Sequence, residues 1–457
     1  MKAGVDKRVV LFVAATASFL TPFMGTSINI AIPSIGREFS ADAITLSWIS
    51  TAYLLAAAMF LVPLGRLADI HGRKRVFLAG IAGYTVVSFL CGLAGSEALL
   101  VGLRALQGFT DAMMFGTSIA IVASIYPPEQ RGRALGVTVA SVYAGGALGP
   151  FIGGFLTHYL GWRSIFYLTT VLGLLAVALT LWKMRGEWAE AHGQKFDVIG
   201  SVIYGLALLG VMYGFRLLPS VTGVWVILGG ALMLAAFVLR ESRVAYPVLD
   251  VRLFRNNAVF ALSNLSALIN YAATFAVSFL LSLFLQYVKG LDPRSAGLIM
   301  LSQPVMMAIF SPLAGRLSDR IEPRIVASAG MALSTTGLLL TAFLGAGSPL
   351  AHIVAILMLC GLGFALFSSP NTSAIMGSVE RQHYAVASAT TGAMRLIGQM
   401  LSMGIAALII ALRVGQVEIT PEYYPAFLRA FRLAFIIFAV LCCAGTFASL
   451  SRGKVRD

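Results

Sequence analysis

Three ionisable side chains stand inside long apolar stretches of the sequence, where a charge is costly to keep. Asp111 and Arg104 fall within residues 98–125, and Arg395 falls within residues 385–412. Asp111 is the one acidic residue placed well inside such a stretch. A carboxylate at the depth of a bilayer is commonly functional, because it can take up and release a proton. Two interpretations stay open for Asp111: a proton relay, or a fixed polar anchor to another helix.

The two arginines also have alternative interpretations. Arg104 lies seven residues before Asp111, about two helical turns, so both face the same side about 10 Å apart. That distance permits coupling between Arg104 and Asp111 through water. The alternative is that Arg104 is a permanent hydrogen-bond partner of backbone carbonyls in the first two spans. Arg395 either binds an anionic substrate or braces the C-terminal part of the chain.

The elements that must position these side chains are membrane-spanning helices. Of 457 residues, 58% are hydrophobic and 11% are charged, against about 25% charged in a soluble domain. Apolar runs of roughly 20 residues, enough to cross the hydrocarbon core, recur along the whole chain. They predict an all-α membrane protein with fourteen spans, at about 9–33, 45–66, 76–95, 98–125, 134–157, 163–183, 198–217, 222–240, 258–288, 296–316, 325–345, 350–377, 385–412 and 427–450.

The basic residues support this topology. With a cytoplasmic N-terminus, 23 of the 33 Lys and Arg residues fall in inner segments, which is the positive-inside pattern. The net charge of +14 is therefore spread over short loops. No basic domain remains outside the membrane to bind DNA or RNA, and contact with anionic lipid is expected instead.

A motif follows the second span. The segment from Gly65 to Arg75 reads G-R-L-A-D-I-H-G-R-K-R. Gly65 permits close helix approach, and Gly72 supplies backbone freedom for a tight turn. Asp69 and Arg73 are four residues apart and can form an ion pair if the helical turn continues.

A related string, G-R-L-S-D-R, runs from Gly315 to Arg320 and includes Asp319. Each string follows the second span of a block of six, which indicates an internal duplication with two extra spans inserted between the blocks. Parallel six-helix repeats that enclose a site at the midplane are a known plan for transporters.

Here the sequence resembles the major facilitator superfamily, whose loop between helices 2 and 3 carries G-x-L-A-D-x-x-G-R-K-x. Further matches are R-A-L-Q-G from Arg104 to Gly108, and G-x-x-x-G-P-x-x-G-G from Gly145 to Gly154, which resembles the family's antiporter motif. With P-x-x-D-x-x-x-F-R from Pro247 to Arg255 and the 6 + 2 + 6 layout, the chain is similar to the fourteen-span drug:proton antiporters (EmrB/QacA-like).

The resemblance implies roles for these motifs. It implies a gating latch made by Gly65, Asp69, Gly72 and Arg73, with Asp319 as the counterpart. Gly149 and Pro150 would form a hinge interface that helps to close the outer side.

One position departs from the family pattern. Met24 stands where the branch usually has an acidic residue in the first span. Proton coupling through that position is therefore excluded, and Asp111 with Arg104 becomes the candidate coupling pair.

Flexible Met, aromatic and buried amide side chains suit promiscuous apolar binding. The candidate substrate-binding residues are Met24, Asn29, Tyr53, Asn264, Asn270, Tyr271, Gln303, Asn371, Arg395 and Gln399.

The sequence thus predicts a major-facilitator-like fold with an N-terminal six-helix bundle (1–183), two inserted helices with cytoplasmic linkers (184–257) and a C-terminal six-helix bundle (258–457). The expected function is proton-coupled efflux of amphipathic or cationic small molecules by alternating access. The chain is expected to be a monomer in the cell (inner) membrane, in contact with lipid, with both termini cytoplasmic. An enzyme, a metal site, a cofactor and nucleic-acid binding are not expected. The alternatives are a coupled exporter of a specific metabolite or organic anion and a membrane sensor that does not transport.

Overall fold

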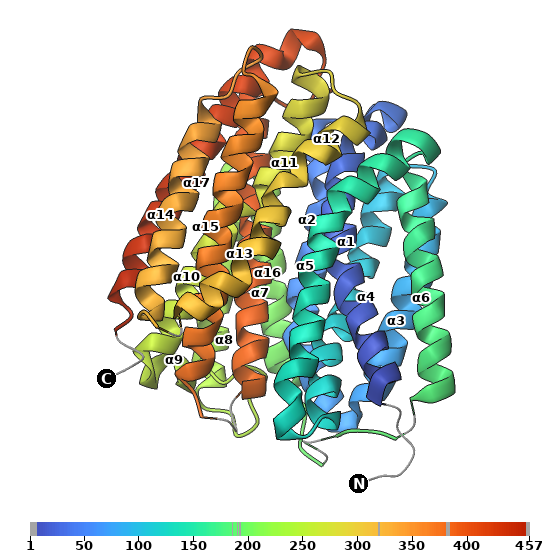
Figure 1. Cartoon of the computed structure of the whole chain (residues 1–457), viewed down its shortest axis with the longest axis vertical. Helices are drawn as coiled ribbons and strands as arrows, with labels where there is room; N and C mark the ends of the chain where they lie inside the picture. Colours follow the sequence, from blue (N-terminus) through green and yellow to red (C-terminus); the bar gives the residue numbers. More distant parts are fainter. Residues whose placement is uncertain are drawn as a thin grey trace.

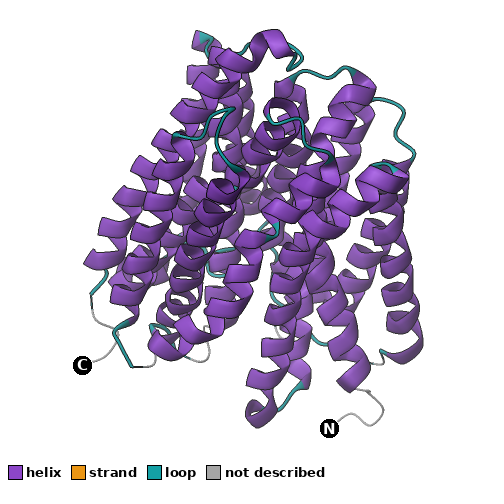
Figure 2. Cartoon of the chain, turned by 45° about the horizontal axis from the view of Figure 1, so that its top comes forward, coloured by secondary structure: helices purple, strands orange, loops and turns teal. Residues whose placement is uncertain are grey.

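The computed structural model describes residues 7–184, 186–189, 191, 193–318, 320–380 and 384–453. Within these residues the chain is helical throughout, with loops gathered at the two ends of long helices (Figures 1 and 2). Fourteen helical stretches of the described chain are long and apolar enough to cross a membrane. This number agrees with the fourteen spans predicted from the apolar runs.

The first six helices lie together on one side of the molecule (Figure 1), and we call them the N-terminal group. Their bounds are α1 Lys7–Phe39, α2 Ala43–His71, α3 Arg73–Gly92, α4 Glu97–Ile125, α5 Pro128–Leu160 and α6 Arg163–Lys183. Two of them, α2 and α4, begin at a capping side chain that accepts hydrogen bonds from free amide groups, which stabilises a helix start. Asp42, for example, accepts hydrogen bonds from the amides of Ile44 and Thr45 at the start of α2.

The inserted helices are α7 (Val198–Leu217) and α8 (Val221–Glu241), followed by the short α9 (Arg252–Asn256). α7 packs against both α2 and α16. The Tyr204 hydroxyl of α7 donates to the Ala58 carbonyl of α2 at 3.2 Å, while Met212 contacts α16 at Gly404. α8 packs mainly on α7, and most of its surface is exposed.

The remaining helices lie on the other side of the molecule, and we call them the C-terminal group. Their bounds are α10 Ala258–Thr274, α11 Ala276–Leu283, the π-helix η1 Phe284–Val288, α12 Pro293–Met300, α13 Ser302–Ser318, α14 Pro323–Ala342, α15 Leu350–Gly377, α16 Tyr384–Arg413, the 3₁₀ turn η3 Pro421–Tyr423 and α17 Tyr424–Ser451.

Two spans predicted as continuous helices are interrupted. The stretch 258–288 is divided into α10, α11 and η1, and the tenth span is divided into α12 and α13. At the first interruption, the backbone amide of Ala276 donates to the Ser402 hydroxyl of α16 at 3.0 Å. A free amide in an apolar layer is costly, and the bond to Ser402 removes this cost. The pattern of apolar residues gives no sign of this bond.

The first described helix, α1, begins and the last, α17, ends on the same side of the molecule (Figure 1). We call this the terminal end and the other the distal end. Near the distal end, hydrogen bonds join α1 to the C-terminal group. Gln286 donates to the Ile30 carbonyl at 2.8 Å, and the Tyr287 hydroxyl donates to the Pro33 carbonyl at 3.4 Å.

Candidate functional site

Asp111 lies at the middle of α4, and 3% of its surface is exposed. Thr21 of α1 donates a hydrogen bond to Asp111 Oδ1 at 2.5 Å. Tyr53 of α2 lies beside the same carboxyl group, although no hydrogen bond of ordinary geometry joins the two. The lone acid of α4 thus faces hydroxyl groups from two other helices of its own group.

Arg395 of α16 approaches the same carboxyl group from the C-terminal group. Its positive charge, like that of Arg104, lies close enough to Asp111 to interact with it. The Arg395 guanidinium lies 5.0 Å from the ring centroid of Phe115, which is one helical turn beyond Asp111. Its Nε has no hydrogen-bond partner. Spacing along the chain cannot place α16 opposite α4, so the proximity of Arg395 to Asp111 is not predictable from the sequence.

Arg104 is fully buried and has several contacts within the N-terminal group. Its Nε donates to the Ile49 carbonyl of α2 at 3.1 Å, and its Nη1 donates to Gln107. The guanidinium also lies 4.3 Å from the ring centroid of Tyr53. Tyr53 therefore stands between Arg104 and Asp111, so an aromatic ring joins the candidate coupling pair.

Nη2 of Arg104 is buried without a partner. The bond to Ile49 matches the alternative interpretation of Arg104 as a partner of backbone carbonyls. The unpaired nitrogen leaves Arg104 able to bind a further acceptor.

The four candidate asparagines have different surroundings. Asn29 joins the two groups, because it donates to Ser278 of α11 at 2.8 Å and accepts from Ser50 of α2 at 3.0 Å. Asn264 is bonded within the C-terminal group, where it accepts from Thr391 at 3.2 Å. Both of these side chains therefore form hydrogen bonds between helices in this state.

Asn371 accepts from Arg452 at 2.6 Å and donates to the Ser263 carbonyl at 3.1 Å. This places Asn371 in a brace near the terminal end. Asn270 differs, because both its side-chain atoms are buried without a hydrogen-bond partner. An unpaired buried amide is costly, which makes Asn270 the strongest ligand candidate among the four.

The other candidates divide by exposure. Met24 is fully buried in α1. Tyr271, Gln303 and Gln399 are partly exposed. Tyr271 packs edge-on against Phe364 with ring centroids 5.5 Å apart and lies within electrostatic range of Arg395.

The glycine motif of α5 packs against two partners. Gly149 and Gly153 lie against Thr26 and Ser27 of α1, and Ser27 donates to the Gly149 carbonyl at 2.9 Å. Small residues allow such close backbone approach. These contacts hold α5 to α1 inside the N-terminal group.

The next part of the same motif faces the C-terminal group. The carbonyl of Pro150 and the backbone of Gly154 lie directly against Gly297 of α12. α5 and α12 therefore meet at their backbones near the distal end. This is the position at which the sequence predicted a hinge interface.

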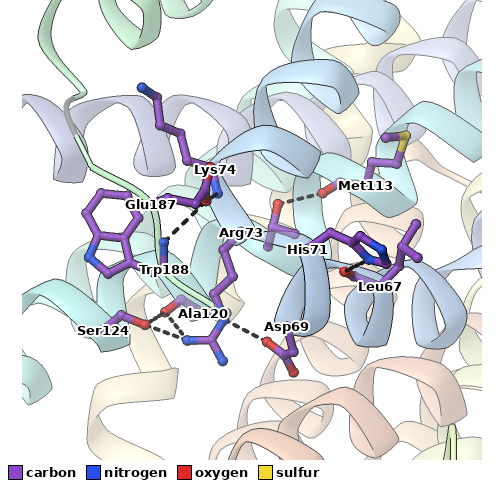
Figure 3. Close-up of polar contacts among 11 residues, drawn as sticks. Leu67, Asp69, His71, Arg73, Lys74, Met113, Ala120, Ser124, Glu187 and Trp188 are labelled. Carbon is purple, nitrogen blue, oxygen red and sulfur yellow. Dashed lines mark hydrogen bonds and ion pairs between the residues drawn. The ribbon is translucent and has the colours of Figure 1, made fainter. Parts of the chain in front are cut away.

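The loop between α2 and α3 holds its predicted ion pair (Figure 3). Arg73 Nε lies 2.7 Å from Asp69 Oδ1, and Arg73 is 3% exposed. Arg73 also donates to the Ser124 hydroxyl of α4 at 2.5 Å. The pair thus ties α2, α3 and α4 together within one group.

Gly65 and Asp319 are the other two predicted gating positions of these loops. Around Gly65, no described residue from another part of the chain lies within 4 Å of the place that a Cβ would take, so the described residues show no close helix approach there. Asp319 lies outside the described residues.

A segment that the sequence showed only as a polar linker packs on this loop. We call residues 184–197 the strap. The Trp188 carbonyl accepts from the Arg73 amide at 2.8 Å, and the Ala191 amide donates to the Asp69 carbonyl at 2.9 Å. Glu187 Oε1 accepts from the Lys74 amide at 2.7 Å (Figure 3).

Glu187 therefore caps the start of α3. Gly72 has a φ of 117° and no side chain to cap this helix, and the Glu187 carboxyl group occupies the space where a Cβ would lie. A carboxylate at a helix N-terminus is also favoured by the helix dipole. The one sequence signal for this contact was a helix that begins after glycine without a capping residue.

We expect Glu187→Ala to destabilise the protein by about 0.5–2 kcal/mol, as loss of a helix cap does. Glu187→Gln should have a smaller effect, because its amide oxygen still accepts from Lys74. Thermal unfolding in detergent would measure both, with Glu422→Ala, an exposed acid at the distal end, as the matched control. Equal midpoints for Glu187→Ala and the control would contradict the capping role.

The family model described as Major Facilitator Superfamily matches residues 14–239 and 264–454. The Riboflavin transporter RibZ of Clostridioides difficile is 30% identical over 377 residues, covering 82% of each chain. Multidrug resistance protein Stp of Mycobacterium tuberculosis is 33% identical over 393 residues, covering 84% of this chain and 72% of that protein.

Solved structures agree on the fold. A bacterial homologue of the human lysosomal transporter Spinster, in an inward-facing and unoccupied conformation, is similar with a TM-score of 0.71, 16% identity, and coverage of 98% of this chain and 96% of that one. A transporter of the POT family in complex with a thioalcohol-conjugated peptide gives a TM-score of 0.72 at 15% identity, with coverage of 96% and 94%.

The match to the family model spans most of the chain, and relatives named for drug resistance and export are 33% and 29% identical to it over the aligned residues. The fourteen apolar helices and the solved neighbours fit the same assignment. The chain belongs to the major facilitator superfamily of membrane transporters, with relatives in its drug-efflux branch.

Proposed function

We propose that the chain exports amphipathic or cationic small molecules in exchange for protons, by alternating access. The observation that carries the proposal is the position of Asp111. It is a buried carboxyl group of one helix group that faces Arg395 of the other. A change in its protonation therefore alters the attraction between the two groups.

The coupling step follows from Coulomb attraction in a medium of low dielectric. Ionised Asp111 attracts Arg395 and favours a closed midplane. Protonation removes that attraction and leaves Thr21 and Tyr53 as its neutral partners. A cationic substrate competes for the same carboxylate, so binding of substrate and of the proton become mutually exclusive.

The moving parts would be the two six-helix bundles, residues 1–183 and 258–457, with the inserted helices between them. Bonds from Asn29 to Ser278 and from Gln286 to Ile30 join the two bundles and support a distal end that is closed in this state. We assign the terminal end to the cytoplasm, from the excess of basic residues in its loops. A monomer in contact with membrane lipid suffices for this cycle.

A second candidate is the coupled export of a specific metabolite or organic anion. Arg395 is partly exposed and its buried Nε is unpaired, so it can bind an anionic group. One relative is named as a riboflavin transporter, which fits a narrow substrate range. A sensor that does not transport would bind ligand without flux.

The test is an uptake screen in proteoliposomes with an imposed pH gradient, using lipophilic cations, neutral drugs and organic anions. We expect gradient-driven accumulation of the cations and its loss on addition of a protonophore. Accumulation of anions alone, abolished by Arg395→Ala, would support the second candidate instead. Binding without accumulation of any compound would contradict both.

A further inference from the structure

Two carboxyl groups outside the candidate site are buried side by side at the terminal end. Asp197 precedes the first residue of α7, and Glu241 is the last residue of α8. Glu241 is fully buried and Asp197 is 9% exposed. Neither residue is part of the proposed transport step.

One oxygen of each group has strong partners. Asp197 Oδ1 accepts from the Gly200 amide at 2.9 Å and from Arg240 Nη2 at 2.9 Å. Glu241 Oε2 accepts from the Leu249 amide at 2.9 Å. The pair therefore connects the start of α7, the end of α8 and the segment that follows α8.

The other two oxygens have no partner and point to the same place. Asp197 Oδ2 and Glu241 Oε1 are buried without a hydrogen bond. They lie 2.7 Å and 2.6 Å from the position that a Cβ on Gly200 would take. Two carboxylate oxygens that approach one buried point repel each other, unless a proton or another cation lies between them.

We propose that Asp197 and Glu241 form a proton-binding site in which one proton, carried by Glu241, bonds to the free oxygen of Asp197. This arrangement satisfies both orphaned oxygens with a single hydrogen bond. It also leaves one negative charge, on Asp197, opposite the one positive charge of Arg240. A glycine at position 200 keeps the space open for the two oxygens.

The surrounding charges place the proton on Glu241. Burial raises the pKa of Asp197, but the hydrogen bonds from Arg240 and Gly200 and the charge of Arg240 outweigh it, so the pKa of Asp197 is lowered. Other charged groups of the adjoining segments, Lys195, Arg243, Asp250 and Arg252, are exposed or half-buried. Arg240 is within ion-pair distance of Asp197.

Loss of the proton would leave two negative charges and one arginine in a buried space. Glu241 would then be driven toward water, and its bond to the Leu249 amide would break. The site therefore makes attachment of the segment 242–251 depend on pH, with attachment at low pH and release at high pH. It requires no transport activity and is separate from the coupling role of Asp111.

The first test measures the mobility of that segment. A spin label at Tyr246→Cys, where the side chain is 44% exposed, would be placed in a Cys443→Ser background, because Cys443 is the exposed free thiol of the described chain. We expect the label to become more mobile as pH rises, and Glu241→Gln, which cannot lose a proton, to keep it immobile. Mobility that is independent of pH in the otherwise unchanged protein would overturn the proposal.

The second test detects the proton itself by infrared spectroscopy in lipid nanodiscs. The band of a protonated carboxyl group should lose intensity in Glu241→Gln and keep it in Asp250→Asn, a half-buried acid of the same segment. Equal intensity in Glu241→Gln and in the unchanged protein would contradict the site. Loss of the band on addition of Na⁺ at constant pH would also contradict it, because the ligand would then be a metal cation.

Discussion

Asp111→Asn is expected to abolish proton-driven transport while leaving the protein folded. The amide keeps the size of the side chain and can still accept from Thr21, so the packing at the middle of α4 is preserved. It cannot take up or release a proton, and it carries no charge to attract Arg395. Uptake of a lipophilic cation under an imposed pH gradient should fall to the level of empty liposomes.

The controls for this result separate charge from packing. Thr21→Val removes the 2.5 Å hydrogen bond but keeps the carboxyl group, so coupling should persist with a shifted pH dependence. Substrate binding measured without a gradient should survive in Asp111→Asn for neutral compounds and weaken for cations. Undiminished gradient-driven uptake in Asp111→Asn would refute the assignment of the proton site.

Gly297→Ala is expected to open the distal end. A methyl group on α12 at this position would collide with the Pro150 carbonyl and press on the Cα atom of Gly154, 3.4 Å away. Overpacking of this kind costs about 1–3 kcal/mol. If the whole of this cost falls on the closed state, the ratio of closed to open forms decreases by about 5- to 150-fold.

Spin labels at Leu93 and Phe343 report this balance, because both are exposed at the distal end, one on each group. Their separation should increase in Gly297→Ala, and transport should slow because closure has become unfavourable. The matched control is Gly146→Ala, on α5 three residues before Gly149, where the nearest atom is 3.9 Å from a new Cβ. An unchanged distance distribution in Gly297→Ala would show that this contact does not govern closure.

The sequence was sufficient to predict the helices because the membrane imposes their length and apolar character. The fourteen apolar runs match fourteen helices of the described chain. The interruptions were not predictable, because the break before Ala276 depends on Ser402, which lies 126 residues away. The cap on α3 was missed for the same reason, since Glu187 comes from a distant linker.

The sequence predicts which residues belong to the candidate site, but it does not predict which of them lie close together. Asp111, Arg104 and Arg395 stand out in the sequence because a charge within an apolar run is costly. Which of them meet is decided by how α2, α4 and α16 pack, and no spacing rule gives that. Tyr53, which the sequence predicts only as a substrate-binding residue, lies between Arg104 and Asp111.

The position of α7 has a consequence for molecules dissolved in the bilayer. The N-terminal and C-terminal groups meet along two flanks, and α7 covers the flank where α2 packs on α16, through Tyr204 and Met212. A lipophilic compound diffusing within a leaflet therefore meets a wall of helix on this flank. The insertion makes the molecule one-sided, because the opposite flank, where α5 packs on α12 and α13, has no such inserted helix among the described residues.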